Sequence, residues 1–125
     1  LPQSVYKTGG YRIQGRSAED AEQILNDAVA LEEAGADLLL VECIPAKLAA
    51  SICQNVSVPV IGIGAGAACD AQVLVSYDML GLTHGKPASF VKNFLQDSSS
   101  IQDAFKAYVQ QVKNGQFPAA EHTFN

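Results

Sequence analysis

The sequence predicts an α/β fold built on a parallel sheet, and two observations lead to this prediction. Three short apolar runs, at residues 37–43, 58–63 and 72–77, are typical of strands buried on both faces. Segments with apolar residues at helical spacing alternate with them, which indicates βαβ units joined by right-handed crossovers. Three strands are too few to close a barrel, so the pattern fits either a small open sheet or part of a (β/α)8 barrel.

The first helix is predicted to begin at Ser17 and to stop at Gly35. Ser17 and Asp20 have the spacing of a capping box, in its weaker Asp form. A glycine suits the left-handed residue that ends many helices. The predicted apolar face consists of Ala21, Ile24, Leu25, Ala28 and Leu31.

A second helix is predicted from Pro45 to about Asn55. Proline suits the first turn of a helix, and Leu48 and Ile52 have the spacing of a buried face. After the third apolar run, a short helix is predicted from about Pro87.

The last helix is predicted between Ser100 and Gly115. Ser100 with Asp103 suits its start, and the glycine suits its end. Its apolar stripe consists of Ile101, Ala104, Phe105, Tyr108, Val109 and Val112. The ten residues that follow show no period and predict no regular element.

Composition limits the classes of partner. The chain has 125 residues, of which 48% are hydrophobic, so one ordinary domain with a core is expected. A net charge of -5 argues against nucleic acid or an anionic membrane as partner. No apolar run reaches the length of a membrane span. The three cysteines form neither a CxxC pair nor a disulfide framework, so a reducing, cytoplasmic compartment is expected.

Glu42 is the first candidate for a functional residue because it ends a buried apolar run. In parallel α/β folds the reactive groups lie at the carboxyl ends of the strands. A partly desolvated Glu there has a raised pKa, which suits it to proton transfer. The alternative is a solvated carboxylate, or one that is capped by the turn before Pro45. The residues alone favour the two interpretations equally.

The segment GIGAG is a weaker candidate. Gly62, Gly64 and Ala67 satisfy the loose dinucleotide pattern G-x-G-x-x-A, but Asp78 is only roughly placed as its acidic partner. Glycines after a barrel strand also bind phosphates in many barrels. The favoured interpretation is a sharp backbone bend, or the close approach of a helix or a ligand.

Arg12 and Arg16 lie between glycines in the opening segment. A mobile lid with an anion-binding arginine is one interpretation, and an ordinary surface loop is the favoured one.

The remaining polar candidates have mainly structural interpretations. His84 and His122 are too far apart to suggest a metal motif, and His122 is expected on the surface or in a docked tail. Asp70 and Asp78 flank the third apolar run, where a solvated or turn role is favoured over a site carboxylate. The sequence contains neither HExxH nor GxSxG, so a zinc protease or a serine hydrolase is not expected.

Six segments, in this order, resemble the ketopantoate hydroxymethyltransferase family. They are PQSVYKTGGYRIQGR, LLLVECIP, VPVIGIGAG, QVLVSYDMLGL, FVKNF and EHTF. Together they span the chain from Pro2 to Phe124, and their order is far more specific than any one of them.

The resemblance implies a fold of the phosphoenolpyruvate/pyruvate group of (β/α)8 TIM barrels. Residues 1–125 would be one partial domain, the C-terminal half of the barrel with the segments resembling strands six to eight. Three buried strands alone would expose apolar surface that the absent N-terminal half covers. The 125 residues alone are therefore expected to be unstable and inactive.

The resemblance also implies an activity, the first committed step toward pantothenate and coenzyme A. The family removes a proton from C3 of 2-oxoisovalerate (3-methyl-2-oxobutanoate), and the enolate attacks the methylene carbon of 5,10-methylenetetrahydrofolate. Glu42 matches the glutamate that acts as general base in the family. Mg2+ chelates the 2-oxo acid and stabilises the enolate. Family members are homo-oligomers, commonly decamers.

Other features do not carry over from the family. Its Mg2+ ligands and its substrate-contacting Ser, Lys and His belong to the first half of the barrel, so no metal ligand is assigned in this chain. Tyr77 stands where a His is expected, and Ala67, Ala68 and Ala71 vary the loop after the glycines. Substrate contacts in that loop are therefore left unassigned.

Two other functions remain as alternatives. One is a different 2-oxo-acid enzyme of the same barrel group, such as a lyase, which a folate requirement would separate. The other is a small non-catalytic α/β module that binds a phosphate or nucleotide at GIGAG.

Overall fold

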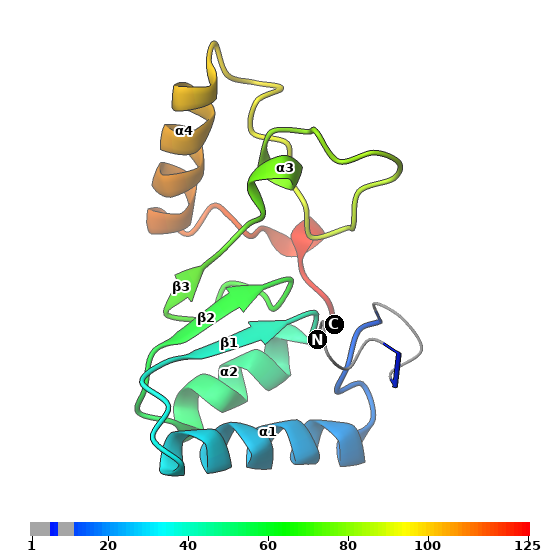
Figure 1. Cartoon of the computed structure of the whole chain (residues 1–125), viewed down its shortest axis with the longest axis vertical. Helices are drawn as coiled ribbons and strands as arrows, with labels where there is room; N and C mark the ends of the chain where they lie inside the picture. Colours follow the sequence, from blue (N-terminus) through cyan, green and yellow to red (C-terminus); the bar gives the residue numbers. More distant parts are fainter. Residues whose placement is uncertain (1–5, 8–11) are drawn as a thin grey trace.

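The chain forms one small parallel sheet with helices packed against it (Figure 1). The computed structural model describes residues 6–7 and 12–125. The strands are β1 (Leu39–Glu42), β2 (Val60–Ile63) and β3 (Ala71–Gln72), and β2 lies between the other two. Both strand pairs are parallel, so the predicted α/β fold class with a parallel sheet is confirmed.

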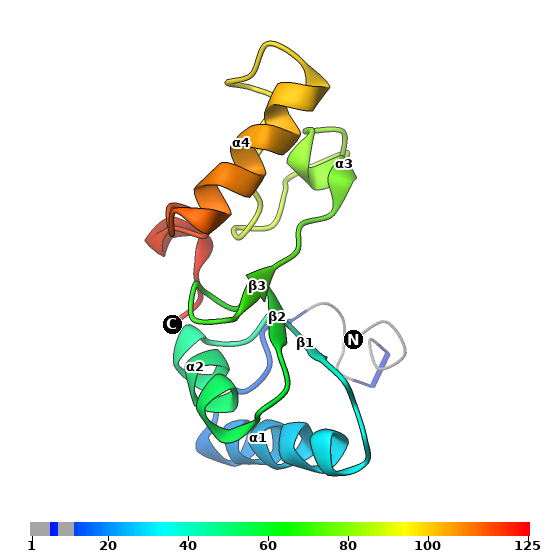
Figure 2. The same ribbon diagram turned by 90° about the vertical axis from the view of Figure 1, so that its left-hand side faces the viewer.

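The two faces of the sheet are covered very differently. The helices α1 (Ala18–Glu33) and α2 (Ala46–Asn55) lie against one face (Figures 1 and 2). Leu39 of β1 is buried on this side, whereas its neighbour Leu40 is 54% exposed. Because side chains alternate along a strand, Glu42 shares the open face with Leu40.

The core between the helices and the sheet is continuous and apolar. Its buried members are Ala28, Leu39, Ile44, Leu48, Ala49, Ile52, Val60 and Ala65. They come from α1, β1, α2 and β2 and from the turns that follow β1 and β2, so the core fixes the carboxyl ends of both strands. The predicted buried face of the second helix, with Leu48 and Ile52, is confirmed.

Helix α1 begins and ends where the sequence predicts. The Ser17 hydroxyl accepts a hydrogen bond from the Asp20 amide at 3.1 Å, which satisfies one of the free amides of the first turn. At the other end Gly35 has φ of 96°, the left-handed region that favours glycine.

The carboxylate of Glu32, in the last turn of α1, bonds to the loop before β2. Its Oε1 accepts hydrogen bonds from the amides of Ser57 at 2.7 Å and Val58 at 3.1 Å. The helix therefore holds in place the segment that leads into β2.

Replacing Glu32 with Ala is expected to destabilise the chain by about 1 kcal/mol, because two loop amides lose a charged acceptor and solvent replaces it only in part. Thermal unfolding of the full-length protein measures the change. Full-length here means a protein that contains this chain and has the length of the relatives described below. Glu33→Ala removes an exposed neighbouring carboxylate and is the matched control. Equal melting temperatures for the two variants would contradict the assigned role of Glu32.

The second half of the chain packs around a separate apolar cluster. The helices α3 (Ser76–Met79) and α4 (Ile101–Lys113) and the short 3-10 helix η1 (Ala120–His122) lie beyond β3 (Figure 2). The buried members of the cluster are Leu74, Met79, Phe94, Ala104 and Phe117. The Tyr108 hydroxyl of α4 donates to the Gln72 carbonyl at 2.9 Å and so ties this half to the sheet.

The predicted third strand at residues 72–77 is mostly wrong. Only Gln72 of this run is paired, as the last residue of β3, and Ser76 already begins α3. The chain leaves the sheet because Leu74 is buried in the second cluster rather than against β2. The branched, apolar residues predict an extended backbone correctly, but pairing needs a neighbouring strand that continues as far.

The predicted short helix from Pro87 is also wrong. Residues 83–100 contain turns and no helix. The Asn93 side chain accepts hydrogen bonds from the amides of Leu95 at 3.0 Å and Gln96 at 3.3 Å, and it thereby replaces helical carbonyl acceptors. Helix α4 itself has the predicted bounds, with Ser100 capping the Asp103 amide at 3.1 Å. Its predicted apolar stripe is only partly buried, since Ile101, Phe105 and Val109 are 51%, 41% and 48% exposed.

Candidate functional site

Glu42 lies at the carboxyl end of β1, on the face of the sheet that no helix covers. It pairs in register with Ile63 of β2, and its side chain is half-buried. Pairing with β2 and the apolar core on the other face of the sheet fix this strand end, so the carboxylate lies at the edge of the open face. A carboxylate in this position can accept a proton from a ligand that lies over the strand ends.

The residue after Glu42 has an unusual backbone. Cys43 has φ of 53°, which is uncommon for a residue other than glycine. Two hydrogen bonds fix it: its amide donates to the Ile63 carbonyl at 3.0 Å, and its carbonyl accepts from the Gln14 amide at 3.0 Å. The turn therefore reverses the chain directly behind the glutamate and limits the movement of the Glu42 backbone.

The thiol of Cys43 is a poor nucleophile. Burial, followed by the charge of Glu42, raises the pKa of Cys43 to about 11. Burial likewise raises the pKa of Cys69 to about 12, with a further contribution from Cys53. Both thiols are therefore neutral near pH 7.

Alkylation of Cys43 by iodoacetamide should be about 100-fold slower at pH 8 than that of a peptide cysteine, because a pKa two units above the usual value leaves far less thiolate. The rate should rise about tenfold per pH unit through pH 9, since the thiolate fraction rises in proportion. Mass spectrometry of the separate cysteine peptides measures both rates. A rate that levels off below pH 9 would contradict the raised pKa.

The glycine loop after β2 is filled by the protein's own side chains. Gly64 has φ of 59°, and a Cβ built on it would lie 2.8 Å from the Phe90 ring and 3.3 Å from the Phe124 ring. Gly66 has φ of 81°, and its Cβ would lie 2.7 Å from that of Ala46, the first residue of α2. The favoured interpretation, a sharp bend with close approach of a helix, is confirmed.

The dinucleotide interpretation of GIGAG is wrong. In that motif the glycines open a helix whose N-terminus binds the pyrophosphate. Here residues 64–70 form turns that lead into β3, and no helix begins among them. The space above Gly64 is occupied by two aromatic rings, so a phosphate has no cradle there.

A pocket of about 450 Å³ lies beside this turn. Its lining combines two cations with aromatic rings, and it consists of Arg12, Ile13, Arg16, Cys43, Ala88, Ser89, Phe90 and Phe124. Phe90 and Phe124 meet edge to face with ring centroids 6.2 Å apart. The pocket thus brings together the opening segment, the end of β1, the loop before α4 and the last residues of the chain.

Sequence reasoning found only part of this pocket. The two arginines were candidates, although an ordinary surface loop was the favoured interpretation. Phe90 and Phe124 were missed because they lie far apart in the sequence. The sequence signal for this contact is Gly64, on which both rings pack, because a glycine directly after a strand indicates the close approach of another group.

The other polar candidates lie away from Glu42 and have structural roles. Asp70 Oδ2 accepts a hydrogen bond from the Val60 amide at 2.9 Å, at the start of β2. Asp78 Oδ1 accepts from the Thr83 hydroxyl, within the loop after α3. His84 is exposed in that loop. The turn roles favoured for the two aspartates are confirmed.

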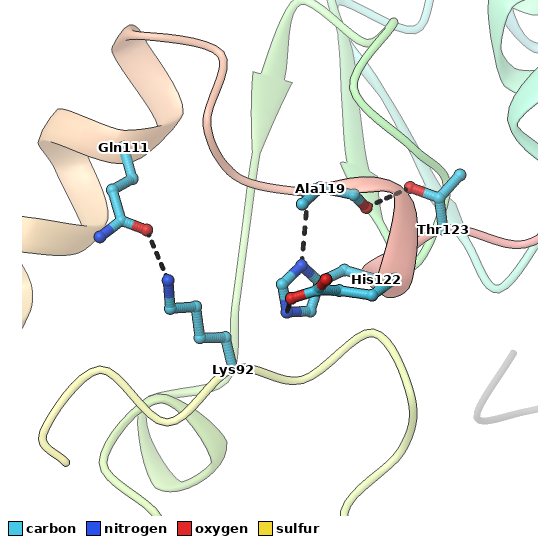
Figure 3. Close-up of polar contacts among 6 residues, drawn as sticks. Lys92, Gln111, Ala119, His122 and Thr123 are labelled. Atoms are coloured by element: carbon cyan, nitrogen blue, oxygen red, sulfur yellow. Dashed lines mark hydrogen bonds and ion pairs between the residues drawn. The ribbon is translucent and has the colours of Figure 1, made fainter. Parts of the chain in front are cut away.

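His122 lies in the docked tail, as the sequence predicts. Its Nδ1 accepts a hydrogen bond from the Ala119 amide at 3.2 Å, and the Thr123 hydroxyl donates to the Ala119 carbonyl at 2.9 Å (Figure 3). Burial lowers the pKa of His122, against the smaller opposing effect of Glu121. Nearby, Lys92 Nζ donates to Gln111 Oε1 at 2.9 Å. These contacts fix the tail that supplies Phe124 to the pocket.

Metal ligands do not gather in the described residues. Within 6–7 and 12–125, no group of three or more His, Cys, Asp or Glu side chains could hold a metal ion. In the same ranges, no helix is long and apolar enough to cross a membrane.

Comparison with known proteins decides the family. A family model described as ketopantoate hydroxymethyltransferase matches residues 1–120, nearly the whole chain. The chain belongs to the ketopantoate hydroxymethyltransferase family. This confirms the resemblance drawn from the sequence, and the family consists of TIM-barrel enzymes.

Relatives of this hydroxymethyltransferase family are similar along the whole chain. A 3-methyl-2-oxobutanoate hydroxymethyltransferase 2 from Hahella chejuensis is 58% identical over 124 residues, which cover 99% of the chain and 47% of the relative. The 3-methyl-2-oxobutanoate hydroxymethyltransferase of Nitrosospira multiformis is 57% identical, with 98% and 47% covered. That of Neisseria gonorrhoeae is 58% identical, with 98% and 46% covered. The chain spans about half the length of the curated relatives it matches.

Proposed function

We propose that the full-length protein transfers a hydroxymethyl group from 5,10-methylenetetrahydrofolate to 2-oxoisovalerate, forming ketopantoate for pantothenate and coenzyme A synthesis. Membership of the ketopantoate hydroxymethyltransferase family is the observation that carries this proposal. In the balanced reaction one water supplies the hydroxyl oxygen, and tetrahydrofolate is the second product.

In this proposal Glu42 is the general base. Its carboxylate would accept the proton from C3 of the 2-oxo acid, and the enolate carbon would then form a bond to the folate methylene carbon. Of the two C–N bonds of that methylene carbon, one would be replaced by the new C–C bond and the other by the C–O bond to water, and both nitrogens would leave protonated in tetrahydrofolate. Three features support the role: the position at a strand end, the open face shared with Leu40, and the bonded turn at Cys43. A fixed carboxylate loses little freedom on reaching the geometry for proton transfer.

The chain supplies only part of such a site. We therefore place the proposed Mg2+ on ligands outside these 125 residues, together with the groups that hold the 2-oxo acid. When bound, Mg2+ would supply Lewis-acid stabilisation of the enolate. The proposal also includes a homo-oligomer of full-length subunits.

The test uses the full-length protein and 2-oxoisovalerate in deuterium oxide. Proton NMR follows loss of the C3 hydrogen without folate, and it follows ketopantoate after 5,10-methylenetetrahydrofolate is added. We expect exchange in the first experiment and product only in the second. Exchange without product under folate would instead favour the alternative, another 2-oxo-acid enzyme of the same barrel group. Absence of exchange would contradict the proposal.

A further inference from the structure

The pocket beside Glu42 has the chemistry of a site for an aromatic carboxylate. Its volume of about 450 Å³ lies within the range of roughly 300–1,000 Å³ that is usual for small-molecule sites. Arg12 and Arg16 line it together with Phe90 and Phe124. Guanidinium groups bind carboxylates through paired hydrogen bonds, and aromatic rings pack against flat apolar groups.

The two arginines are available for a ligand. Both are exposed, and none of the described Asp or Glu side chains lines the pocket. The salt bridges among the described residues join Lys106 to Asp103 and His122 to Glu121, so neither guanidinium is paired with a described carboxylate. Arg12 and Arg16 thus give this pocket a local positive charge, although the net charge of the chain is -5.

The pocket is built on the residues that directly follow the two paired strand ends, one of which carries Glu42. Gly64 directly follows Ile63, which pairs with Glu42, and both aromatic rings pack on Gly64. On the other side, Cys43 lines the pocket and its carbonyl accepts from the Gln14 amide, midway between the two arginines in the sequence. A ligand in the pocket would therefore contact Cys43, the residue that follows the proposed base.

We infer that this pocket binds the p-aminobenzoylglutamate part of the folate co-substrate, with its benzoyl ring on Phe90 and Phe124 and its glutamate carboxylates on Arg12 and Arg16. The inference rests on the proposed function. Of the two co-substrates proposed there, 2-oxoisovalerate has a carboxylate but no aromatic ring. Folate has both a benzoyl ring and carboxylates, the two kinds of group that the aromatic and cationic lining residues can bind.

The first test compares two co-substrates in the full-length protein: 5,10-methylenetetrahydrofolate and its pteroate analogue, which lacks the glutamate. The wild type should show a KM at least about tenfold higher for the analogue, because the two glutamate carboxylates are lost and the remaining benzoate carboxylate is held directly on the ring. The Arg12→Ala/Arg16→Ala variant should show the same raised KM for both co-substrates. A variant that still distinguishes the two would overturn the inference.

A second arm separates the two possible carboxylate ligands. In the folate-free exchange at C3, the double variant should keep the KM of the wild type for 2-oxoisovalerate to within about twofold. A large rise in that KM would mean that the arginines bind the 2-oxo acid, and it would overturn the inference. Lys86→Ala removes an exposed cation outside the pocket and controls for loss of positive charge alone.

Direct binding keeps the test independent of the reaction. Calorimetry with p-aminobenzoylglutamate should show binding to the wild type and at least about tenfold weaker binding to the double variant and to Phe124→Ala. Failure of C3 exchange in the wild type would contradict the proposed function and leave this measurement valid. Equal binding by wild type and variants would contradict the pocket and leave the proposed function standing.

Discussion

Replacing Glu42 with Gln is expected to lower the rate of proton exchange at C3 of 2-oxoisovalerate by at least about 100-fold, the usual contribution of a general base. The amide keeps the size of the side chain and its place beside Ile63, but it cannot accept the proton. Binding of the 2-oxo acid should change little, because the proposed ligands for it lie outside this chain. Exchange followed by NMR in deuterium oxide measures the effect.

Two further variants separate the loss of the Glu42 carboxylate as a base from a general loss of structure. Glu42→Asp keeps the carboxylate but withdraws it from the strand end, so a part of the exchange rate should remain. Glu33→Gln changes an exposed carboxylate on α1, on the helix-covered side of the sheet, and should leave exchange unchanged. Wild-type exchange by Glu42→Gln would remove this residue from the role of base.

The 125 residues on their own are expected to associate or aggregate and to show no exchange. The open face of the sheet carries Leu40 at 54% exposure, and Leu38, two residues earlier in the chain, is 52% exposed. An uncovered strand face and a free edge at β1 favour contacts between copies. Size-exclusion chromatography and binding of a hydrophobic dye measure the expected association. A monodisperse monomer that catalyses exchange would contradict this expectation.

Two leucines of equal exposure provide the matched comparison for that face. Leu40 on β1 is 54% exposed and Leu31 on α1 is 55% exposed. In the isolated chain, Leu40→Gln should reduce dye binding more than Leu31→Gln, because only Leu40 belongs to the sheet face. In the full-length protein we expect Leu40 to be covered, so Leu40→Gln should lower the free energy of unfolding by about 2 kcal/mol or more. Leu31→Gln should lower it much less. Equal melting temperatures there would mean that Leu40 stays uncovered.

The parts of the fold that the sequence predicts correctly are those set by near neighbours. The Ser17 cap, the apolar spacing of Leu48 and Ile52 and the left-handed Gly35 each depend on residues within one or two turns. The position of Glu42 follows from the same logic, because a buried run that ends in a carboxylate marks a strand end in a parallel sheet.

The errors arise where distant contacts decide the structure. The run at residues 72–77 has strand composition, yet burial of Leu74 in the second cluster takes the chain out of the sheet. The pocket depends on Phe90 and Phe124, which lie far apart in the sequence, and Gly64 indicates that something packs there without indicating which residues do. Likewise, the left-handed Cys43 is fixed by bonds to Ile63 and Gln14, and no residue pattern near it predicts that conformation.

The bond between the Ala46 amide and the Phe124 carbonyl, 2.9 Å long, joins the start of α2 to the tail of the chain. During synthesis a ribosome makes β1 and Glu42 well before it makes this tail. Glu42 is therefore synthesised before Phe124, and the pocket beside this strand end is complete only once the tail has been made and has docked on α2.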